Sequence, residues 1–370
     1  MSANRTPAMP AIAKREPFPT PLDPLNAGAY YAIQQLRGGL SLAHKRATSQ
    51  LKRLLAPQAD QPTKPLSAAG QQQLQQRRGR LLAQDWQDAQ RGVYPQSLLF
   101  EAPWPEWLRD YPTFWWDAMR AWQRIQAARH REFAPEIDTS GYPDYYLQNF
   151  HHQTDGYLSE LSARLYDLQV ELFFNGTADA MRRRILTPMQ QALAAPQQPR
   201  RLADLACGTG RTLQFLRAAF PQAALWGMDL SRSYLRKARE RLAAQPGEQP
   251  RLLAANLEAL PCPSDRFHGV SCVFTLHELP APARQRALDE ACRITRPGGA
   301  FVLCDSLQLD DVPALNPMLE NFPVLLHEPY YRHYIHDNIE ARLAQAGFEL
   351  LGTSSHFVSK YWVARKPAAA

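Results

Sequence analysis

The stretch Leu202-Ala203-Asp204-Leu205-Ala206-Cys207-Gly208-Thr209-Gly210 decides the fold of this chain. It begins as a short apolar strand, and its glycine-bearing turn leads into a helical pattern over 211–220. Gly208 and Gly210 permit positive φ and let a ligand approach the backbone closely. The first N–H groups of the following helix have no partner within the helix and can bind a polar group. Strand, turn and helix start together predict a binding site for a nucleotide-like cofactor.

From residue 200 onward, strand and helix patterns alternate, which predicts an α/β region with a mostly parallel seven-stranded sheet and helices on both faces. The expected strands are Arg201–Ala206, Ala224–Met228, Arg251–Ala255, Gly269–Phe274, Ala300–Asp305, Phe348–Ser354 and Phe357–Arg365, the last two antiparallel at the sheet edge. The expected helices between them are Thr209–Ala219, Ser231–Ala244, Ala281–Ile294 and His336–Ala346. Residues 310–334 are an insertion after the fifth strand, and a loop of that length is often a lid.

The first 200 residues show helical spacing instead. We expect a flexible Pro-rich tail (1–25), a basic and aromatic helical region (26–140) and a helical cap (141–199) before the core (200–370). The expected helices are Asn26–Ala56, weakened by Gly38-Gly39, then Ser67–Arg91, Thr113–Glu132, Ser159–Phe174 and Ala178–Ala194. Five of the eight tryptophans lie between residues 104 and 122. They form either a packed aromatic subdomain or a wall for an apolar substrate.

Charge is distributed unevenly along the chain. The net charge is +7, yet residues 1–80 hold 12 Lys or Arg against three Asp or Glu. Residues 26–91 are therefore predicted to contact an acidic partner or an anionic membrane surface, although a solvated basic helix face would look the same. We do not expect nucleic acid as a partner, because no nucleic-acid motif is present and aromatic residues are few in this segment.

Composition excludes several classes of protein. No apolar run reaches the roughly 20 residues of a membrane helix, and no secretory signal is expected at the N-terminus. The five cysteines are odd in number and show no CxxC spacing, which favours a reducing compartment over disulfides and argues against a cysteine metal site. We expect a cytoplasmic protein.

The turn at 204–210 resembles motif I of class I S-adenosylmethionine-dependent methyltransferases. Rossmann dehydrogenases have a similar glycine turn, so the turn alone does not separate the two classes. Four more segments follow in the methyltransferase order: Gly227-Met228-Asp229-Leu230-Ser231, Asn256-Leu257-Glu258-Ala259-Leu260-Pro261, Phe274-Thr275-Leu276-His277-Glu278-Leu279 and Arg293-Ile294-Thr295-Arg296-Pro297-Gly298-Gly299. The resemblance is to the ubiquinone/menaquinone C-methyltransferase group. It covers about residues 200–305 and implies a Rossmann-like fold with S-adenosylmethionine as cofactor.

The resemblance also implies which residues bind the cofactor. They are Asp204, Ala206, Cys207, Gly208, Thr209, Gly210, Asp229, Leu230, Asn256, Leu257 and Thr275. Asp229 is expected to bind the ribose hydroxyls, and Asn256 and Leu257 to bracket the adenine. Asn256 stands where such enzymes more often have Asp, but its amide oxygen can still accept from the exocyclic amine. Cys207 is expected to be a small, turn-compatible residue and not a nucleophile.

Candidate catalytic residues lie outside this set. His277 and Glu278 follow the fourth strand, where the histidine either takes a proton from a phenol, enol or amine acceptor or only packs the turn. His151, His152 and Tyr157 precede the sheet and are candidates to fold over the cofactor, although paired histidines are also common on helix surfaces. No metal site is expected, because the side chains of adjacent histidines point in different directions. His327, Glu328, Tyr330 and Tyr331 of the insertion line the acceptor pocket or only pack against it.

Three functions remain open. The first is in-line methyl transfer to a small aromatic, quinone-like or lipid-like acceptor. The second is methylation of RNA or protein guided by residues 1–80, against which the absence of an Asn-Pro-Pro-Tyr-type segment after the fourth strand argues. The third is a non-catalytic cofactor-binding scaffold, against which the intact turn and Asp229 argue.

Overall fold

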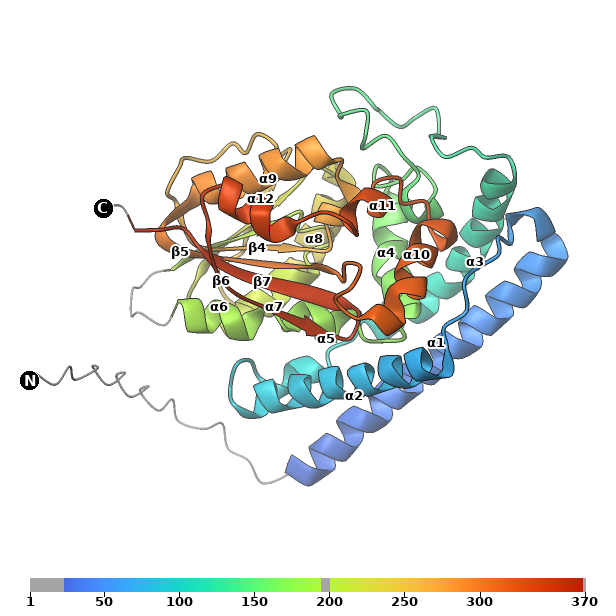
Figure 1. Cartoon of the computed structure of the whole chain (residues 1–370), viewed down its shortest axis with the longest axis horizontal. Helices are drawn as coiled ribbons and strands as arrows, with labels where there is room; N and C mark the ends of the chain where they lie inside the picture. The colour runs from blue at the N-terminus through green and yellow to red at the C-terminus, as the bar shows by residue number, and fades with distance from the viewer. Residues whose placement is uncertain (1–22, 194–199, 369–370) are drawn as a thin grey trace, which may run out of the picture.

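The computed structural model describes residues 23–193 and 200–368, and in them a seven-stranded sheet carries helices on both faces (Figure 1). Most of the predicted tail at 1–25 and the linker Pro196–Pro199 lie outside the described residues. The strands run in the order β3-β2-β1-β4-β5-β7-β6. Their bounds are β1 Arg201–Leu205, β2 Ala224–Asp229, β3 Arg251–Ala254, β4 Phe267–Val273, β5 Thr295–Ser306, β6 Glu349–His356 and β7 Ser359–Arg365. Only β7 runs antiparallel to its neighbours, β5 and β6, so the predicted α/β sheet is confirmed.

The strands are apolar because helices cover both faces of the sheet. All seven residues of β4 are buried, as expected for a parallel strand with helices on both sides. In β1, Leu202 packs into one core and Ala203 into the other, following the two-residue period of a strand. Strand β5 begins five residues earlier than predicted, because Thr295 pairs with Phe267 before a bulge at Gly269.

Two helix layers bury these faces. One face is covered by α6 (Leu186–Ala192), α7 (Arg211–Ala219) and α8 (Arg232–Ala243). The other is covered by α9 (Ala281–Ile294) and α12 (Ile339–Gln345). Helix α12 begins three residues later than predicted, because Asn338 caps it by accepting from the backbone N–H of Ala341 at 2.9 Å.

The order of the strands defines a topological switch point between β1 and β4. These strands are parallel neighbours, with Leu205 opposite Cys272, but the chain leaves them in opposite directions along the sheet. Open α/β sheets bind ligands where the strand order reverses in this way. Residues 206–210 and 274–278 both lie at this point, at the carboxyl ends of the two strands.

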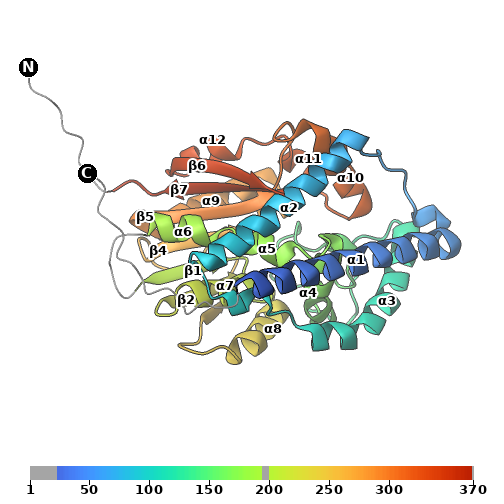
Figure 2. The ribbon, with the colours of Figure 1, turned by 90° about the horizontal axis from the view of Figure 1, so that it is seen from below.

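The N-terminal region packs around the side of this core. Figure 2 shows α1 (Asp23–Leu55) and α2 (Ala68–Gln90) running across the molecule, with α3 (Trp104–Gln126) and α4 (Glu160–Phe173) beside α1. The remaining helical pieces are α5 (Ala178–Arg183), α10 (Asn316–Leu325), α11 (Tyr331–Tyr334) and the short 3-10 turns η1 (Pro57–Ala59), η2 (Gln96–Leu99), η3 (Phe150–His152), η4 (Leu276–Glu278) and η5 (Pro313–Leu315). Among the helices of the described residues, none has both the length and the apolar character needed to span a bilayer.

Several helix predictions need correction. Helix α3 begins at Trp104, nine residues before the predicted start, because Pro105 occupies the first turn, where no N–H is needed, and Pro112 removes only one hydrogen bond inside the helix. The helix predicted at Ala178–Ala194 is divided into α5 and α6. The insertion 310–334, predicted as a loop, contains α10 and α11.

Gly38 lies inside helix α1 although glycine has a low helix propensity, and its missing side chain leaves room for Arg78. Helix α1 continues through it, and a Cβ there would lie 2.8 Å from Arg78 Nη2. Arg78 uses this space to donate to the Gln34 carbonyl at 2.9 Å. Lys45 likewise donates to the Phe173 carbonyl at 2.6 Å. Part of the basic charge predicted to face a partner therefore binds within the molecule, and contact with an acidic partner stays a prediction.

The buried carboxylate of Asp85 ties the N-terminal helices to the core. Tyr30 Oη and Tyr94 Oη donate to it at 2.8 and 2.7 Å, and Arg183 donates through Nε at 2.9 Å and Nη2 at 2.6 Å. These groups come from α1, α2, α5 and the segment before η2. Asp85 and Arg183 are both almost fully buried, so each neutralises a charge that water cannot reach.

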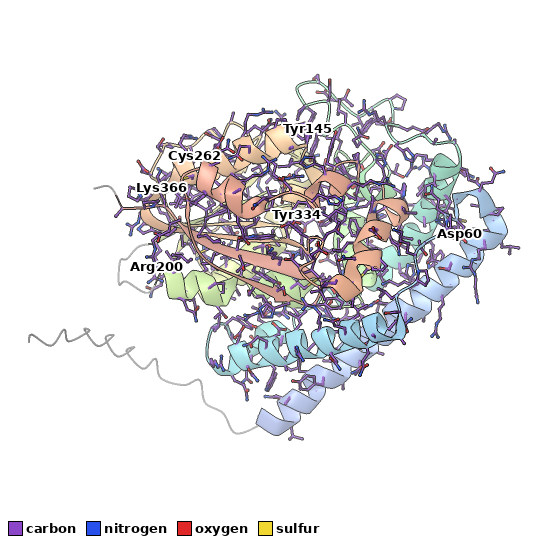
Figure 3. All side chains as sticks on the ribbon, viewed as in Figure 1. Asp60, Tyr145, Arg200, Cys262, Tyr334 and Lys366 are labelled. Carbon is purple, nitrogen blue, oxygen red and sulfur yellow. The ribbon has the colours of Figure 1, made fainter. Side chains whose placement is uncertain are left out.

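Replacing Asp85 tests this anchor. The variant Asp85→Ala is expected to lower the free energy of unfolding by about 3–5 kcal/mol, because it leaves the Arg183 guanidinium buried and unpaired. The control is Asp60→Ala at the periphery of the molecule (Figure 3), where the 3.0 Å pair with Arg53 is exposed and contributes about 0–1 kcal/mol. Chemical denaturation of both variants measures the difference. A loss below about 1 kcal/mol for Asp85→Ala would contradict the anchoring role.

Candidate active site

The turn after β1 is held in an unusual backbone conformation. Ala206, Gly208 and Gly210 have φ of 51°, 53° and 79°. A Cβ on Gly210 would lie 3.0 Å from the Cβ of Ala238, so this glycine lets α7 pack against α8. A Cβ on Gly208 would meet only Tyr234 Cδ1, at 3.9 Å, so its backbone can be approached by a ligand. Both glycines serve the turn, for different reasons.

Asp229, at the end of β2, faces this turn. Its Oδ2 accepts from the Gly208 N–H and its Oδ1 from the Ser231 N–H, both at 2.8 Å. Each oxygen retains a second lone pair for another donor. Burial raises the pKa of Asp229 to about 6, although the N–H groups of Ser231, Gly208 and Leu230 favour the ionised form. The carboxylate is thus fixed in position and can still accept a hydrogen bond from a ligand on each oxygen.

Three of the predicted cofactor residues use their side chains to support the site. Asp204 is buried between β1 and β4 and accepts from Ser271 Oγ at 2.7 Å, and burial raises its pKa to about 7. Thr209 Oγ1 donates to the Asp167 carboxylate on α4 at 2.9 Å. Thr275 Oγ1 donates to the Val273 carbonyl at 3.2 Å. All three side chains therefore bind protein groups.

Cys207 packs as a small residue. A Cβ on Gly227 of β2 would lie 2.8 Å from Cys207 Sγ, so the thiol occupies space that this glycine leaves. Burial raises the pKa of the thiol well above its usual value, which disfavours the thiolate that a nucleophilic role would need. After β3, Asn256 Oδ1 accepts from the Glu258 N–H at 3.0 Å, and Leu257 is buried. A role of Asn256 and Leu257 beside an adenine stays a prediction.

Aromatic side chains from the cap pack over the turn. Tyr157 lies edge to face with Tyr234 at 5.3 Å between ring centroids, and Tyr166 lies 5.4 Å from Tyr234. Phe150 stacks on Tyr157 at 5.4 Å. The Tyr157 carbonyl also accepts from Ser231 Oγ at 2.5 Å, which fixes the cap beside Asp229. Aromatic faces attract cations, including sulfonium groups, but of this set sequence reasoning named only Tyr157.

Four titratable side chains, called here the His–Glu cluster, meet beside the aromatic group: His151, His277, Glu278 and Glu328. His151 Nε2 lies 2.6 Å from Glu328 Oε1 and 3.6 Å from Glu278 Oε1, and His277 Nε2 lies 3.9 Å from Glu278 Oε1. The residues come from η3, from η4 after β4, and from the segment between α10 and α11. The cluster therefore joins the cap, the core and the insertion.

Further groups orient the cluster. His277 Nδ1 lies 2.6 Å from Asp305 Oδ1, and Asp305 Oδ2 accepts from the Leu276 N–H at 2.7 Å. Tyr157 Oη donates to Glu278 Oε1 at 2.6 Å. Asp305 is the second-last residue of the apolar strand β5, which pairs with β4. An acidic residue at that position is the sequence signal that could have identified it.

Burial and mutual charge set the protonation of the cluster. Burial alone would lower the pKa of His277, but the Asp305 carboxylate outweighs it and raises that pKa to about 9. The pKa of His151 is also raised, since Glu328 outweighs burial. Burial, and then the Glu328 charge, raise the pKa of Glu278 to about 7. Both imidazoles of the cluster are thus shifted toward the protonated form, whereas the sequence suggested a free base at His277.

The adjacent histidines diverge, as predicted. His152 faces away from the cluster, with its ring 5.8 Å from His130 and 6.2 Å from His327. Burial lowers its pKa well below the usual value. The structure therefore places His151, Tyr157 and His277 together and leaves His152 outside. The prediction of no metal site considered only the His151/His152 pair, whereas His151 meets Glu328 and His277 from distant parts of the chain.

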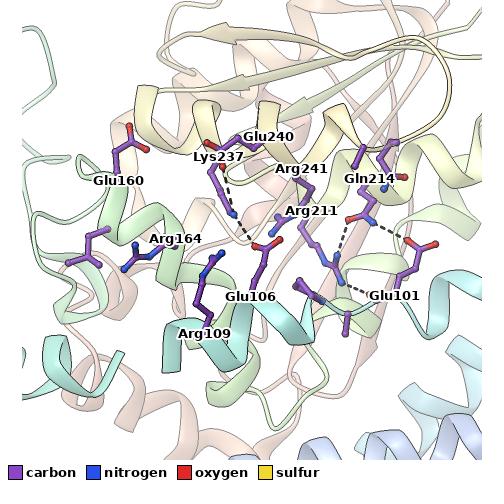
Figure 4. A pocket seen from close by; sticks show the side chains of 15 residues that line it. Glu101, Glu106, Arg109, Glu160, Arg164, Arg211, Gln214, Lys237, Glu240 and Arg241 are labelled. Atoms are coloured by element: carbon purple, nitrogen blue, oxygen red, sulfur yellow. Dashed lines mark hydrogen bonds and ion pairs between the residues drawn. The ribbon is translucent and has the colours of Figure 1, made fainter. Parts of the chain in front are cut away.

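A separate hollow of about 860 Å³ lies between α3, α4, α7 and α8 (Figure 4). Charged side chains line it, including Glu106, which accepts from Lys237 Nζ at 2.9 Å, and Arg211, which donates to Gln214 Oε1 at 2.8 Å. Arg211, at the start of α7, lines this hollow, but no residue of the turn 206–210 or of the His–Glu cluster does. The hollow is therefore distinct from the switch point between β1 and β4.

Comparison with known proteins finds similarity to methyltransferases. A family model for a methyltransferase domain matches residues 202–299. The ubiquinone/menaquinone biosynthesis C-methyltransferase UbiE of Methylobacterium nodulans is 30% identical over 168 residues, covering 45% of this chain and 64% of that protein. The demethylmenaquinone methyltransferase of Thermus thermophilus is 33% identical over 147 residues, covering 40% and 63%. The chain thus spans a little under two thirds of the length of these relatives.

Among solved structures, an S-adenosylmethionine-dependent methyltransferase from Clostridium acetobutylicum aligns with 55% of this chain and 98% of its own, at a TM-score of 0.44 and 12% identity. From the family match, the sheet order and the turn, residues 202–299 belong to a class I S-adenosylmethionine-dependent methyltransferase domain. The recognition made from five sequence segments is confirmed. Its cofactor is S-adenosylmethionine, and the open Gly208 backbone and the spare lone pairs of Asp229 fit that molecule.

Replacing Asp229 tests the cofactor site. The variant Asp229→Ala is expected to weaken S-adenosylmethionine binding by about 10- to 100-fold, because a hydrogen bond to a charged group contributes about 1.5–3 kcal/mol. Isothermal titration calorimetry measures the affinity, and thermal unfolding checks that the turn remains folded. Glu349→Ala on the exposed strand β6 is the matched control. Unchanged affinity in Asp229→Ala would exclude the assigned role.

The raised pKa of Asp229 predicts a pH dependence of binding. Ribose hydroxyls donate to the ionised carboxylate, so affinity is expected to fall as pH decreases through about 6, by up to about tenfold per unit. Another acid, Asp204 on β1, has a pKa raised to about 7. The Asp229 charge also contributes to the raised pKa of Tyr146 and of Tyr142. Asp229→Asn is expected to remove the dependence around pH 6. If the dependence remains in that variant, another group such as Asp204 causes it.

Proposed function

We propose that this protein transfers the methyl group of S-adenosylmethionine to a small aromatic or quinone-like acceptor that loses a proton in the reaction. The observation that carries the proposal is the position of the His–Glu cluster. Its His277 and Glu278 follow β4, at the same switch point of the sheet as the turn after β1. The names of the relatives, which refer to quinone biosynthesis, agree with this acceptor class.

Enclosure of the site supports a small acceptor. Glu328 and His277 are buried, and the cluster is covered by the cap on one side and the insertion on the other. Tyr331 of the insertion lies 5.8 Å from the His277 ring, and its Oη is 2.6 Å from Ser306 Oγ. An RNA or a folded protein would need these segments to open. A small molecule requires much less displacement, so the basic N-terminal region is not needed to explain the site.

The proposed chemistry assigns separate tasks to the residues. S-adenosylmethionine supplies an electrophilic methyl group on a positively charged sulfur. The acceptor atom forms a bond to the methyl carbon as the S–C bond breaks, the sulfur keeps the electron pair, and the acceptor loses one proton. The aromatic side chains of Tyr157 and Tyr234 exclude water and favour the cation. The His–Glu cluster handles the acceptor proton, with Glu278 held by Tyr157 and His277 held by Asp305.

Replacing Glu278 tests this assignment. The variant Glu278→Gln is expected to lower kcat by about 10²–10⁴-fold, the usual contribution of acid–base groups, while leaving the affinity for S-adenosylmethionine unchanged. A screen of phenols and hydroquinones with labelled cofactor provides the acceptor. The control is Glu320→Gln on α10, whose carboxylate makes an exposed pair with Lys64 at 2.7 Å. The proposal fails if no small phenol or quinol is methylated, or if Glu278→Gln retains full turnover.

A further inference from the structure

We propose that the His–Glu cluster binds one divalent transition-metal ion. His151 Nε2, His277 Nε2 and one carboxylate oxygen each from Glu278 and Glu328 lie within 4.8 Å of one another. An ion with bonds of about 2.0–2.2 Å holds its ligand atoms roughly 3–4 Å apart, so small side-chain shifts would complete the site. Two imidazole nitrogens and two carboxylate oxygens suit Zn²⁺, Fe²⁺ or Mn²⁺ better than Mg²⁺ or Ca²⁺, which prefer oxygen ligands.

The Glu328 carboxylate supplies the first independent observation. Its side chain is fully buried, and its close polar contact is with His151 Nε2, which lies 2.6 Å from Oε1. In the described residues no other donor reaches the carboxylate, and Oε2 has no hydrogen-bond partner. Burying a carboxylate with so few donors is costly. An ion bound between Glu328 and His151 would coordinate both groups.

The surroundings of His277 supply the second observation. Its Nδ1 is held by Asp305 at 2.6 Å, so Nδ1 carries the proton. Asp305 is fixed in turn by the backbone N–H groups of Leu276 and Ser306, each at 2.7 Å. In a neutral ring this leaves the lone pair on Nε2, directed at the cluster. Carboxylate–histidine pairs of this kind orient the ligands of many metal sites.

The backbone around His151 supplies the third observation. His151 has φ of 54°, an uncommon conformation for a residue with a Cβ. Nearby, Asn149 Oδ1 accepts from the Glu132 N–H at 2.8 Å, and a Cβ on Gly156 would lie 2.2 Å from the Gln148 carbonyl. The turn 149–156 is therefore held in a strained form by contacts on both sides. That form presents His151 to Glu278 and Glu328.

The composition of the group agrees with this. The buried carboxyl groups of Glu328 and Asp305 and the half-buried carboxyl group of Glu278 lie beside two imidazole rings. Such a combination of oxygen and nitrogen atoms suits a divalent cation.

One consequence rests on the proposed function. The ion would lie at the end of the site where the acceptor binds, and a coordination position not taken by protein would hold an acceptor oxygen. A divalent ion lowers the pKa of a bound hydroxyl group and so makes it a better nucleophile. The metal site itself does not depend on this reaction, because it is defined by the protein ligands.

Metal binding can be tested without cofactor or acceptor, so its outcome is separate from that of methyl transfer. Untagged protein is treated with a chelator, dialysed and titrated with Zn²⁺ and with Mn²⁺ by calorimetry. We expect one equivalent of at least one ion to bind. Elemental analysis of the protein as purified is expected to show the same stoichiometry. No stoichiometric binding of either ion would overturn the proposal.

Variants assign the ligands. Glu328→Gln and His151→Ala are each expected to weaken binding at least 100-fold, and Asp305→Asn, which acts through His277, by about 10- to 100-fold. His152→Ala is the matched control, since that ring lies next in sequence but faces His130 and His327. Equal loss in His152→Ala and His151→Ala would contradict the site.

A spectroscopic measurement covers the case in which a variant does not fold. The wild-type protein loaded with one equivalent of Co²⁺ is expected to show visible d–d bands of nitrogen and oxygen ligation. The five cysteines are all buried as free thiols, and none belongs to the cluster, so intense thiolate-to-cobalt bands are not expected. Thiolate bands, or no bands above those of aqueous Co²⁺, would place the ion elsewhere and overturn the proposal.

Discussion

The parallel pairing of β1 with β4 is the constraint on which the site depends. With Leu205 opposite Cys272, the two strands end at the same level, and the chain must turn away from both at that point. The turn at 206–210, with its positive φ angles, follows the end of β1, and His277 and Glu278 follow the end of β4. Shifting either strand by one residue would send its buried side chains to the opposite face, so the apolar cores fix this register and with it the site.

The N-terminal half of the chain completes the site from outside the sheet. It contributes Tyr157 and His151, while the insertion contributes Glu328, so three segments far apart in sequence meet at one place. The anchoring of α1, α2 and α5 around Asp85 lies on the same side of the molecule as α7. The helical extension thus contributes residues to the candidate active site besides covering the core.

Buried charged groups have two different arrangements in this protein. Asp85 and Arg183 form paired hydrogen bonds, and Asp179 and Arg211 do the same across α5 and α7. In both places an ion pair holds helices together. In the His–Glu cluster two carboxyl groups lie close to two imidazole rings, and Glu328 has no partner other than His151 in the described residues. This arrangement is the basis of the proposed ion site.

The sequence by itself determined the α/β sheet, the antiparallel last strands, the cofactor turn and the position of Asp229, because these follow from local apolar patterns and from residues close together in the chain. It also predicted that the side chains of His151 and His152 diverge, but it kept both as candidate catalytic residues. Only the tertiary structure decided that His151 meets Glu328, that His277 is held by Asp305, and that His152 stands outside. Those contacts span up to 177 positions of the chain and depend on how the cap and the insertion pack, which no local periodicity encodes.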